Sequence, residues 1–148
     1  MVFKFRLQTL LKHKERQEKS LQLDLAALRE AHRQECLVLT ALEEEQKAQQ
    51  RLLRERQTMG RLDIPAIGLI LGYMELLQAK EASQRDAIAI LEQKIERRRE
   101  ELVAVMRERK TIEKLRERQY ESYLLDQKRL ESKVTDEISM SQYNRRAR

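Results

Sequence analysis

The sequence predicts an all-α fold in which two long helices form an antiparallel coiled-coil hairpin with a protruding C-terminal helix. Ala, Glu, Lys, Leu and Arg together supply more than half of the 148 residues, a share typical of coiled coils and long helices. Three Gly and one Pro are too few for the turns of a sheet or a barrel. Two Phe, no Trp and 38% charged residues cannot fill a thick globular core. We therefore expect residues 1–148 to form a single elongated coiled-coil domain.

The first helix is expected over about residues 3–57. Alternating steps of four and three residues from Leu7 to Leu53 meet 14 positions, of which eight are Leu. Apolar residues at this spacing form the seam along which one helix packs on another. The remaining six positions are polar, so the seam should be narrow and interrupted.

The second helix is expected over about residues 65–143, after a turn at about residues 58–64. All three Gly and the only Pro lie between Gly60 and Gly72. Because Pro is tolerated at the first position of a helix, the sequence Asp63-Ile64-Pro65 predicts a helix start. The same ladder of steps, begun at Ile70, runs through this helix and again meets both apolar and polar residues.

A turn centred near residue 61 makes the numbers of two facing residues add up to about 122. Phe3 should then face Gln119, and residues beyond about Glu121 should have no partner helix within the chain. At about 1.5 Å per residue, this segment would project by roughly 30 to 40 Å. An apolar stripe without an internal partner predicts an external one, whereas fraying or self-association of the tail is the alternative. The stripe consists of Tyr120, Tyr123, Leu124, Leu130, Val134 and Ile138.

A second surplus of apolar residues lies just after the turn. The facing segment, residues 45–57, offers only Leu52 and Leu53, so part of the surplus should reach the surface near the hairpin tip. Exposed apolar patches of this kind mark partner sites. The alternative is a tighter turn that folds these side chains over the tip. The surplus consists of Ile64, Ile67, Leu69, Ile70, Leu71, Tyr73, Met74, Leu76 and Leu77.

The sequence contains no signature of catalysis or of a cofactor site. It has no Gly-rich phosphate loop, no HExxH motif and no pair of Cys residues, which predicts a protein that is not an enzyme and needs no cofactor. His32 and Cys36 share a helical face, but two ligands do not make a zinc site. We expect His32 to be a polar seam residue with Cys36 as a small apolar neighbour. His13 has no Ser or Cys companion that would indicate nucleophilic catalysis.

Charge and cysteine content favour a cytoplasmic protein. The longest uncharged run has 11 residues, from Ile64 to Met74, whereas a spanning helix needs about 20. A single Cys suits a reducing compartment. The net charge of +6 leaves a nucleic-acid-binding coiled coil as a competing interpretation. Acids alternate with the bases and stacking aromatics are few, so we expect no nucleic-acid partner.

Three segments resemble the flagellar FliJ family. They are the opening Phe3-Lys4-Phe5-Arg6-Leu7-Gln8-Thr9-Leu10-Leu11, the segment from Arg109 to Gln119, and the closing Asp136-Glu137-Ile138. Their order and spacing, together with the chain length and the two-helix pattern, extend the resemblance over nearly the whole chain. One departure is that Gly68 and Gly72 stand where family members often carry aromatic residues.

The resemblance implies a component of the flagellar type III export apparatus, similar to the central stalk of rotary ATPases, that couples the export ATPase ring to the membrane-embedded export gate. It also implies a peripheral association with the inner membrane through that apparatus, and other export chaperones as further partners. A stalk of another secretion or rotary ATPase would share the fold and is the alternative. By position, the ring-binding residues would include Phe3, Phe5, Leu7, Tyr120, Tyr123 and Leu130, and the gate-binding residues Tyr73 and Leu77.

Overall fold

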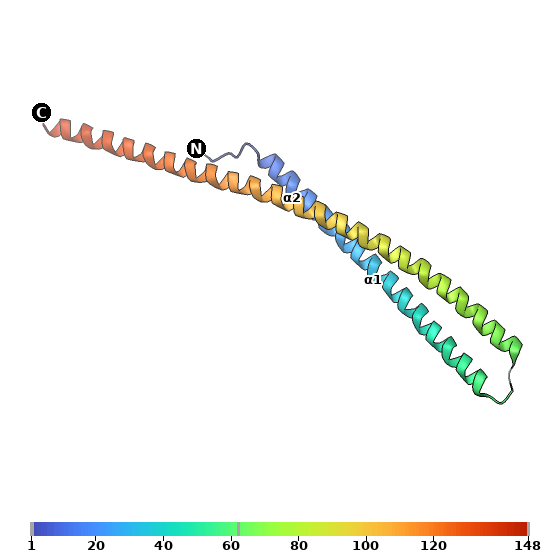
Figure 1. Cartoon of the computed structure of the whole chain (residues 1–148). Coiled ribbons are helices and arrows are strands. Elements are labelled where there is room, and N and C mark those ends of the chain that lie inside the picture. Colours follow the sequence, from blue (N-terminus) through green and yellow to red (C-terminus); the bar gives the residue numbers. More distant parts are fainter. Residues whose placement is uncertain (1, 62, 148) are drawn as a thin grey trace. The chain divides into compact units, whose positions relative to one another are not determined.

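The fold prediction is confirmed by a computed structural model, which describes residues 2–61 and 63–147. The chain forms helix α1, Gln8–Thr58, and helix α2, Ile64–Arg146 (Figure 1). No strand occurs in these two ranges. The expected turn included position 62, which lies outside the described residues.

The start of α2 follows the capping chemistry that the sequence indicates. The side-chain Oδ1 of Asp63 accepts a hydrogen bond from the backbone N–H of Ala66 at 3.3 Å. The backbone oxygen of Asp63 accepts another from Ile67 at 3.0 Å. Asp63 therefore acts as the N-cap, satisfying backbone donors that the first turn of a helix leaves unpaired.

The start of α1 differs from the expected one, because the helix begins at Gln8 rather than near Phe3. Residues 3–7, here called the strap, are not helical. Exposure alternates along the strap: Phe3 and Leu7 are partly buried and Phe5 is buried, whereas the intervening Lys4 and Arg6 are exposed. This two-residue alternation turns three apolar side chains inward, which a helix starting at Phe3 would not do.

The chain divides into two compact units. The terminal unit contains Met1–Lys19 and Val103–Arg148, and the hairpin unit contains Ser20–Leu102. In the terminal unit, the strap and the start of α1 lie beside the C-terminal half of α2, whose last turns extend past the N-terminus (Figure 1). The hairpin unit holds the rest of α1, the connection to α2 and the first half of α2.

Each unit has a narrow core. In the hairpin unit the buried apolar residues are Leu21, Leu25, Ile70, Leu77 and Ile88, and in the terminal unit they are Phe5, Leu11 and Val105. The pairing expected from the sequence is met in both units. An ion pair joins Lys14 to Glu108 and a hydrogen bond joins His32 to Glu92, so the numbers of these partners add up to 122 and 124.

Neither helix contains, within the residues that the structure describes, a stretch long and apolar enough to cross a membrane.

Candidate functional site

An aromatic cluster fastens the strap to α2 in the terminal unit. The ring of Phe3 lies 5.2 Å from the ring of Tyr120, nearly edge-on, and 5.6 Å from that of Tyr123. The rings of Tyr120 and Tyr123 are 6.4 Å apart and stacked. These centroid distances are in the range of favourable aromatic pairs. The expectation that both Tyr residues lack an internal partner is therefore wrong, because the strap reaches them.

The expected ring-binding residues fall into two groups. The strap residues Phe3, Phe5 and Leu7 pack wholly or partly against their own chain, and the relative exposure of Phe5 is only 9%. Leu130 is 55% exposed, and Tyr120 is also exposed at the edge of the aromatic cluster. The structure thus brings Phe3, Tyr120 and Tyr123 together and leaves Leu130 apart from them.

The C-terminal segment of α2, residues 124–147, is here called the overhang. Every one of its residues is exposed except the half-buried Gln127. The apolar stripe expected there is present on the surface, since Leu130, Val134 and Ile138 are each more than half exposed. These three residues are four apart, so they follow one face of the helix. The overhang offers this face to solvent in the chain alone.

Ion pairs fix the alignment of the two helices in the terminal unit. The Nζ of Lys14 lies 2.5 Å from the carboxylate of Glu108. The guanidinium of Arg109 donates to Glu113 on its own helix at 2.6 Å and also to Glu18 on α1. The hydrogen bond to Glu113 is the main cause that raises the pKa of Arg109, and the bond to Glu18 adds to it. These contacts tie α1 to α2 in the two turns of α1 that follow the buried Leu11.

The hairpin tip carries a second exposed apolar surface, as expected. Ile64 and Leu69 are more than three-quarters exposed, Leu76 is half exposed, and Leu71 and Tyr73 are also on the surface. We call these five residues the tip surface. The alternative, a tighter turn that folds these side chains over the tip, is not what the structure shows.

Leu77 does not belong to the tip surface, which corrects the expected gate-binding pair. Its side chain is only 2% exposed and lies in the core of the hairpin unit. The reason is its spacing: Ile70, Met74 and Leu77 are four and three residues apart and form the seam that faces α1. Tyr73, at 39% exposure, remains accessible.

Gly68 and Gly72 lie among the residues of the tip surface. A Cβ atom added at either position would meet no atom within 4 Å, and neither has a positive φ angle. Neither the packing nor the backbone conformation of the hairpin unit therefore requires glycine at these positions.

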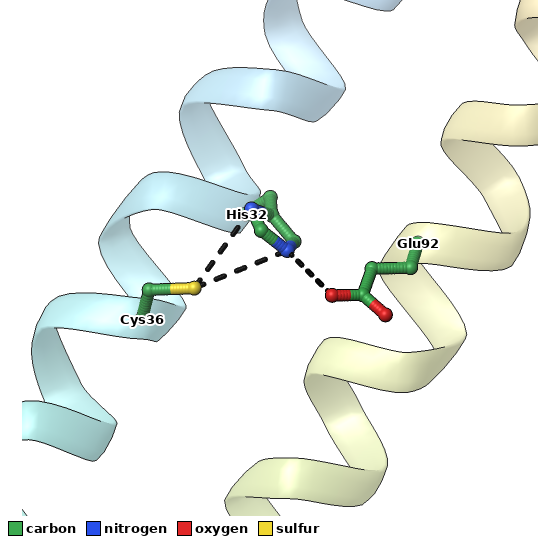
Figure 2. Close-up of polar contacts among 3 residues, drawn as sticks. All are labelled: His32, Cys36 and Glu92. Carbon is green, nitrogen blue, oxygen red and sulfur yellow. Dashed lines mark hydrogen bonds and ion pairs between the residues drawn. The ribbon is translucent and has the colours of Figure 1, made fainter.

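His32, Cys36 and Glu92 meet between the two helices of the hairpin unit (Figure 2). The Nε2 of His32 lies 3.1 Å from Oε1 of Glu92, and the thiol of Cys36 lies 3.8 Å from Nδ1 of the same imidazole. His32 is thus a polar seam residue that bonds across the pair. No cluster of three or more potential ligands able to hold a metal ion occurs among the described residues.

Further polar contacts interrupt the seam of the hairpin unit. The side-chain amide of Gln84 donates to the backbone oxygen and the carboxylate of Glu35, and Arg85 donates to Glu43 at 3.2 Å. The buried Gln46 has a side-chain oxygen without a hydrogen-bond partner among the described residues, as has Glu81. A buried polar atom without a partner is unfavourable, so this part of the seam holds the helices less firmly than an apolar seam would.

The apolar surplus expected after the turn included Leu69, Leu71 and Leu76, which the structure exposes, but only Tyr73 and Leu77 were expected to bind the gate, as the resemblance implies. The signal was present, because the ladder from Ile70 already contains Leu77 and excludes these three Leu residues. The strap was also not expected, although the alternation of apolar and basic residues in it is a two-residue pattern visible in the sequence. The alternating residues are Phe3, Lys4, Phe5, Arg6 and Leu7.

A family model described as "Flagellar FliJ protein" matches residues 3–148, essentially the whole chain. No curated protein and no solved structure matches the chain.

Proposed function

Because the chain belongs to the flagellar FliJ family, whose members are non-catalytic components of the flagellar export apparatus, we propose that it is the coiled-coil stalk that couples the export ATPase ring to the export gate. In this role it assists protein export without carrying out a reaction itself. It is a cytoplasmic protein that associates peripherally with the inner membrane through its partners. Other export chaperones are further partners of the same apparatus.

The exposed stripe of the overhang is the observation that carries this proposal. Leu130, Val134 and Ile138 follow one helical face, and about half of the surface of each is exposed. An apolar face aligned in this way is one that could pack against a partner. At about 25 cal/mol per Å² of apolar surface, burial of a few hundred Å² in a ring would contribute several kcal/mol before the cost of association is subtracted. The overhang is therefore the segment that we assign to the ATPase ring. Tyr120, at the edge of the aromatic cluster, extends the same surface.

We assign the tip surface to the export gate. Its five apolar residues, Ile64, Leu69, Leu71, Tyr73 and Leu76, are exposed on the first turns of α2 and are not needed to fill the hairpin core. Large exposed apolar residues that cluster in this way are typical of protein interfaces. The buried Leu77 supports the tip surface indirectly, because it packs in the core and holds this part of α2 against α1.

Stimulation of the purified export ATPase tests the ring assignment. The double variant Leu130→Ala with Ile138→Ala should lose at least tenfold in affinity for the ATPase and should fail to stimulate it at concentrations at which the wild type does. The matched control is Leu125→Ala with Met140→Ala. These residues are at least as exposed, at 56% and 68%, but lie off the stripe. Equal losses of affinity in the two double variants would contradict the assignment. Unchanged stimulation of the ATPase by the variant Leu130→Ala with Ile138→Ala would also contradict it.

Binding to the purified cytoplasmic part of the export gate tests the assignment of the tip. Leu69→Ala with Leu76→Ala should weaken binding at least tenfold while the melting temperature stays within about 2 °C of the wild type, because exposed side chains contribute little to stability. Leu23→Ala with Ile90→Ala, two exposed residues of the same unit away from the tip, is the control. Unaltered gate binding by the tip variant would refute the assignment.

A further inference from the structure

Four exposed arginines surround the end of the hairpin unit at which α1 connects to α2 (Figure 1). We call them the basic collar. At the rise of an α-helix, the first of them lies about 10 Å before Thr58, the last residue of α1. All four are therefore close to the connection. The members of the basic collar are Arg51, Arg54, Arg56 and Arg61.

Charge is distributed unevenly along the hairpin unit. Residues 51–74 contain the four bases of the collar and two acids, a net charge of +2. The rest of the unit contains nine bases and thirteen acids, a net charge of −4. Of the two acids near the collar, Asp63 uses its carboxylate to cap α2. The end of the hairpin unit is thus positive, whereas the remainder of the same unit is negative.

The basic collar has no counter-charge of its own. In the part of the chain that the structure describes, none of its guanidinium groups makes an ion pair or a hydrogen bond. Arg33, Arg85 and Arg98 of the same unit, by contrast, each pair with a carboxylate. Arg56 has a structural role, because a base in the last turn of α1 offsets the helix dipole. The other three members of the collar are not explained by contacts within the described chain.

Exposed aliphatic side chains lie at the same end as the collar. Met59, directly after α1, and Ile64 and Leu69, at the start of α2, are each more than half exposed. The sequence from Ile64 to Met74 contains no charged residue. Long Arg side chains can hold their charged ends away from such apolar groups, so the two kinds of side chain can contact different layers of a partner. Aliphatic side chains flanked by bases are typical of segments that bind at the interface of an anionic bilayer.

We propose that the end of the hairpin unit docks on the surface of a bilayer that contains anionic phospholipids. Met59, Ile64 and Leu69 enter the boundary between headgroups and acyl chains, and the basic collar binds the lipid phosphates around them. This inference goes beyond the proposed function, which assigns the tip surface to a protein, because the lipid contact needs no gate. A tip that binds a membrane-embedded gate lies next to the bilayer, so the two contacts are compatible.

Among partners that carry negative charge, a bilayer matches the side chains at this end best. A nucleic acid offers phosphates but no hydrocarbon surface, and Tyr73 is the only aromatic residue in the hairpin unit that could stack on a base. An acidic protein segment would neutralise the collar without burying Met59 and Ile64. An anionic bilayer offers phosphates and hydrocarbon at adjoining depths, so it accommodates both the collar and the aliphatic residues.

Flotation of the purified full-length protein with vesicles tests the proposal without any other protein. The vesicles contain about 30% phosphatidylglycerol, and vesicles of phosphatidylcholine alone are the neutral reference. Binding is measured at about 100 mM salt and again at higher salt, because screening weakens a contact between exposed charges. The collar variant is Arg51→Gln with Arg54→Gln and Arg61→Gln. It leaves Arg56 in place to offset the dipole of α1.

A control variant removes the same charge elsewhere in the hairpin unit. It is Lys94→Gln with Arg97→Gln and Arg99→Gln, three exposed bases of α2 that make no ion pair within the described residues. Each base near an anionic surface raises affinity about fivefold, so the collar variant should bind at least about tenfold more weakly than the wild type. The control should lose less than about threefold, since its bases lie away from the bilayer. Circular dichroism checks that both variants remain helical.

The absence of Trp from the chain allows the apolar contact to be followed separately. In Met59→Trp, the emission of the single indole should shift to shorter wavelength when anionic vesicles are added, because the ring leaves water. In Leu37→Trp, at an exposed residue of α1 away from the connection, the emission should stay unchanged. Met59→Ala with Ile64→Ala should weaken binding several-fold and keep its salt dependence, because the collar remains.

The outcomes separate this inference from the assignment of the tip surface to the gate. Failure of the wild type to float with anionic vesicles would overturn the inference, whatever the result with the purified gate. Equal losses in the collar and control variants would also overturn it, because the attraction would then depend on net charge alone. So would collar-dependent binding of a short DNA duplex without binding of vesicles, which would indicate a nucleic acid. A collar variant that loses gate binding but floats like the wild type would assign the collar to a protein and overturn the lipid contact.

Discussion

The terminal unit and the hairpin unit use the same two helices but join them by different side chains. In the terminal unit, the strap adds an aromatic cluster of Phe3, Tyr120 and Tyr123 to the helix seam. In the hairpin unit, aliphatic residues alternate with polar contacts such as His32 to Glu92. The exposed apolar surfaces to which we assign partners also differ in place, since one lies on the overhang of the terminal unit and the other at the tip of the hairpin unit.

This difference shows how a chain with a narrow core can keep two interaction surfaces. An apolar residue on the four-and-three ladder, such as Leu77, packs between the helices and therefore cannot contact a partner protein. An apolar residue off that ladder, such as Leu69, stays exposed and can contact a partner. So does a residue of α2 that lies beyond the N-terminal end of α1, such as Leu130. The following experiments alter one unit at a time and ask whether the other is affected.

Deletion of residues 124–148 should have the largest effect. The cut lies after Tyr123, so the aromatic cluster with Phe3 is kept. We expect loss of about 3 kcal/mol or more of binding free energy, roughly a hundredfold in affinity for the ATPase, because the stripe is removed. The melting temperature and gate binding should be preserved. Collapse of the remaining fold would show that the overhang is a structural part of the terminal unit.

Leu77→Ala should be the most destabilising single substitution in the hairpin unit. Removal of a buried Leu side chain costs about 2–4 kcal/mol through lost burial and the cavity left behind. Leu69→Ala, by contrast, should change the free energy of unfolding by less than about 0.5 kcal/mol. Urea unfolding followed by circular dichroism compares the two. Similar effects of both substitutions would mean that the tip surface is packed in solution.

Phe3→Ala should release the strap with a smaller effect on stability. The two ring contacts and the partial burial of Phe3 together are worth about 1–2 kcal/mol. Trypsin should then cleave after Lys4 and Arg6 several times faster than in the wild type, because a released backbone fits the protease. Val2→Ala, at a residue that is 85% exposed, is the control. Unchanged cleavage rates would show that Phe3 does not hold the strap.

Glu30 should titrate far below its ordinary range with little effect on stability. Hydrogen bonds from Arg33, at 2.7 and 3.0 Å, and from Gln34, at 2.9 Å, lower its pKa from 4.5 to about 2. A lowered pKa means that the contribution of the ionised group to stability is present above pH 4.5 and is lost as the pH falls toward 2. Arg33→Ala should raise the pKa, as measured by NMR, whereas Arg29→Ala should not.

The sequence predicted the helices and their pairing well because both depend on periodic features. The ladder from Leu7, the cluster of breakers near Gly60 and the cap at Asp63 are local signals, and facing residues follow from the position of the turn. The strap was not predicted although its two-residue alternation is visible in the sequence, because five residues are a short signal and the rings that Phe3 contacts, Tyr120 and Tyr123, lie over a hundred residues away in the chain. Leu77, which the resemblance placed at the gate-binding surface, was expected to be exposed because the apolar surplus was treated as one patch, without separating its seam residues, and it is buried instead.

The two glycines of the tip surface have a consequence for the local stability of α2. Glycine within a helix is less favourable than alanine by about 0.5–1 kcal/mol, and Gly68 and Gly72 gain no compensating contact in the described structure. The first turns of α2 should therefore open more often than the turns around Ile88, and their amide hydrogens should exchange with solvent faster. The chain thus presents its exposed leucines on a segment that can adjust its backbone when a partner closes over it.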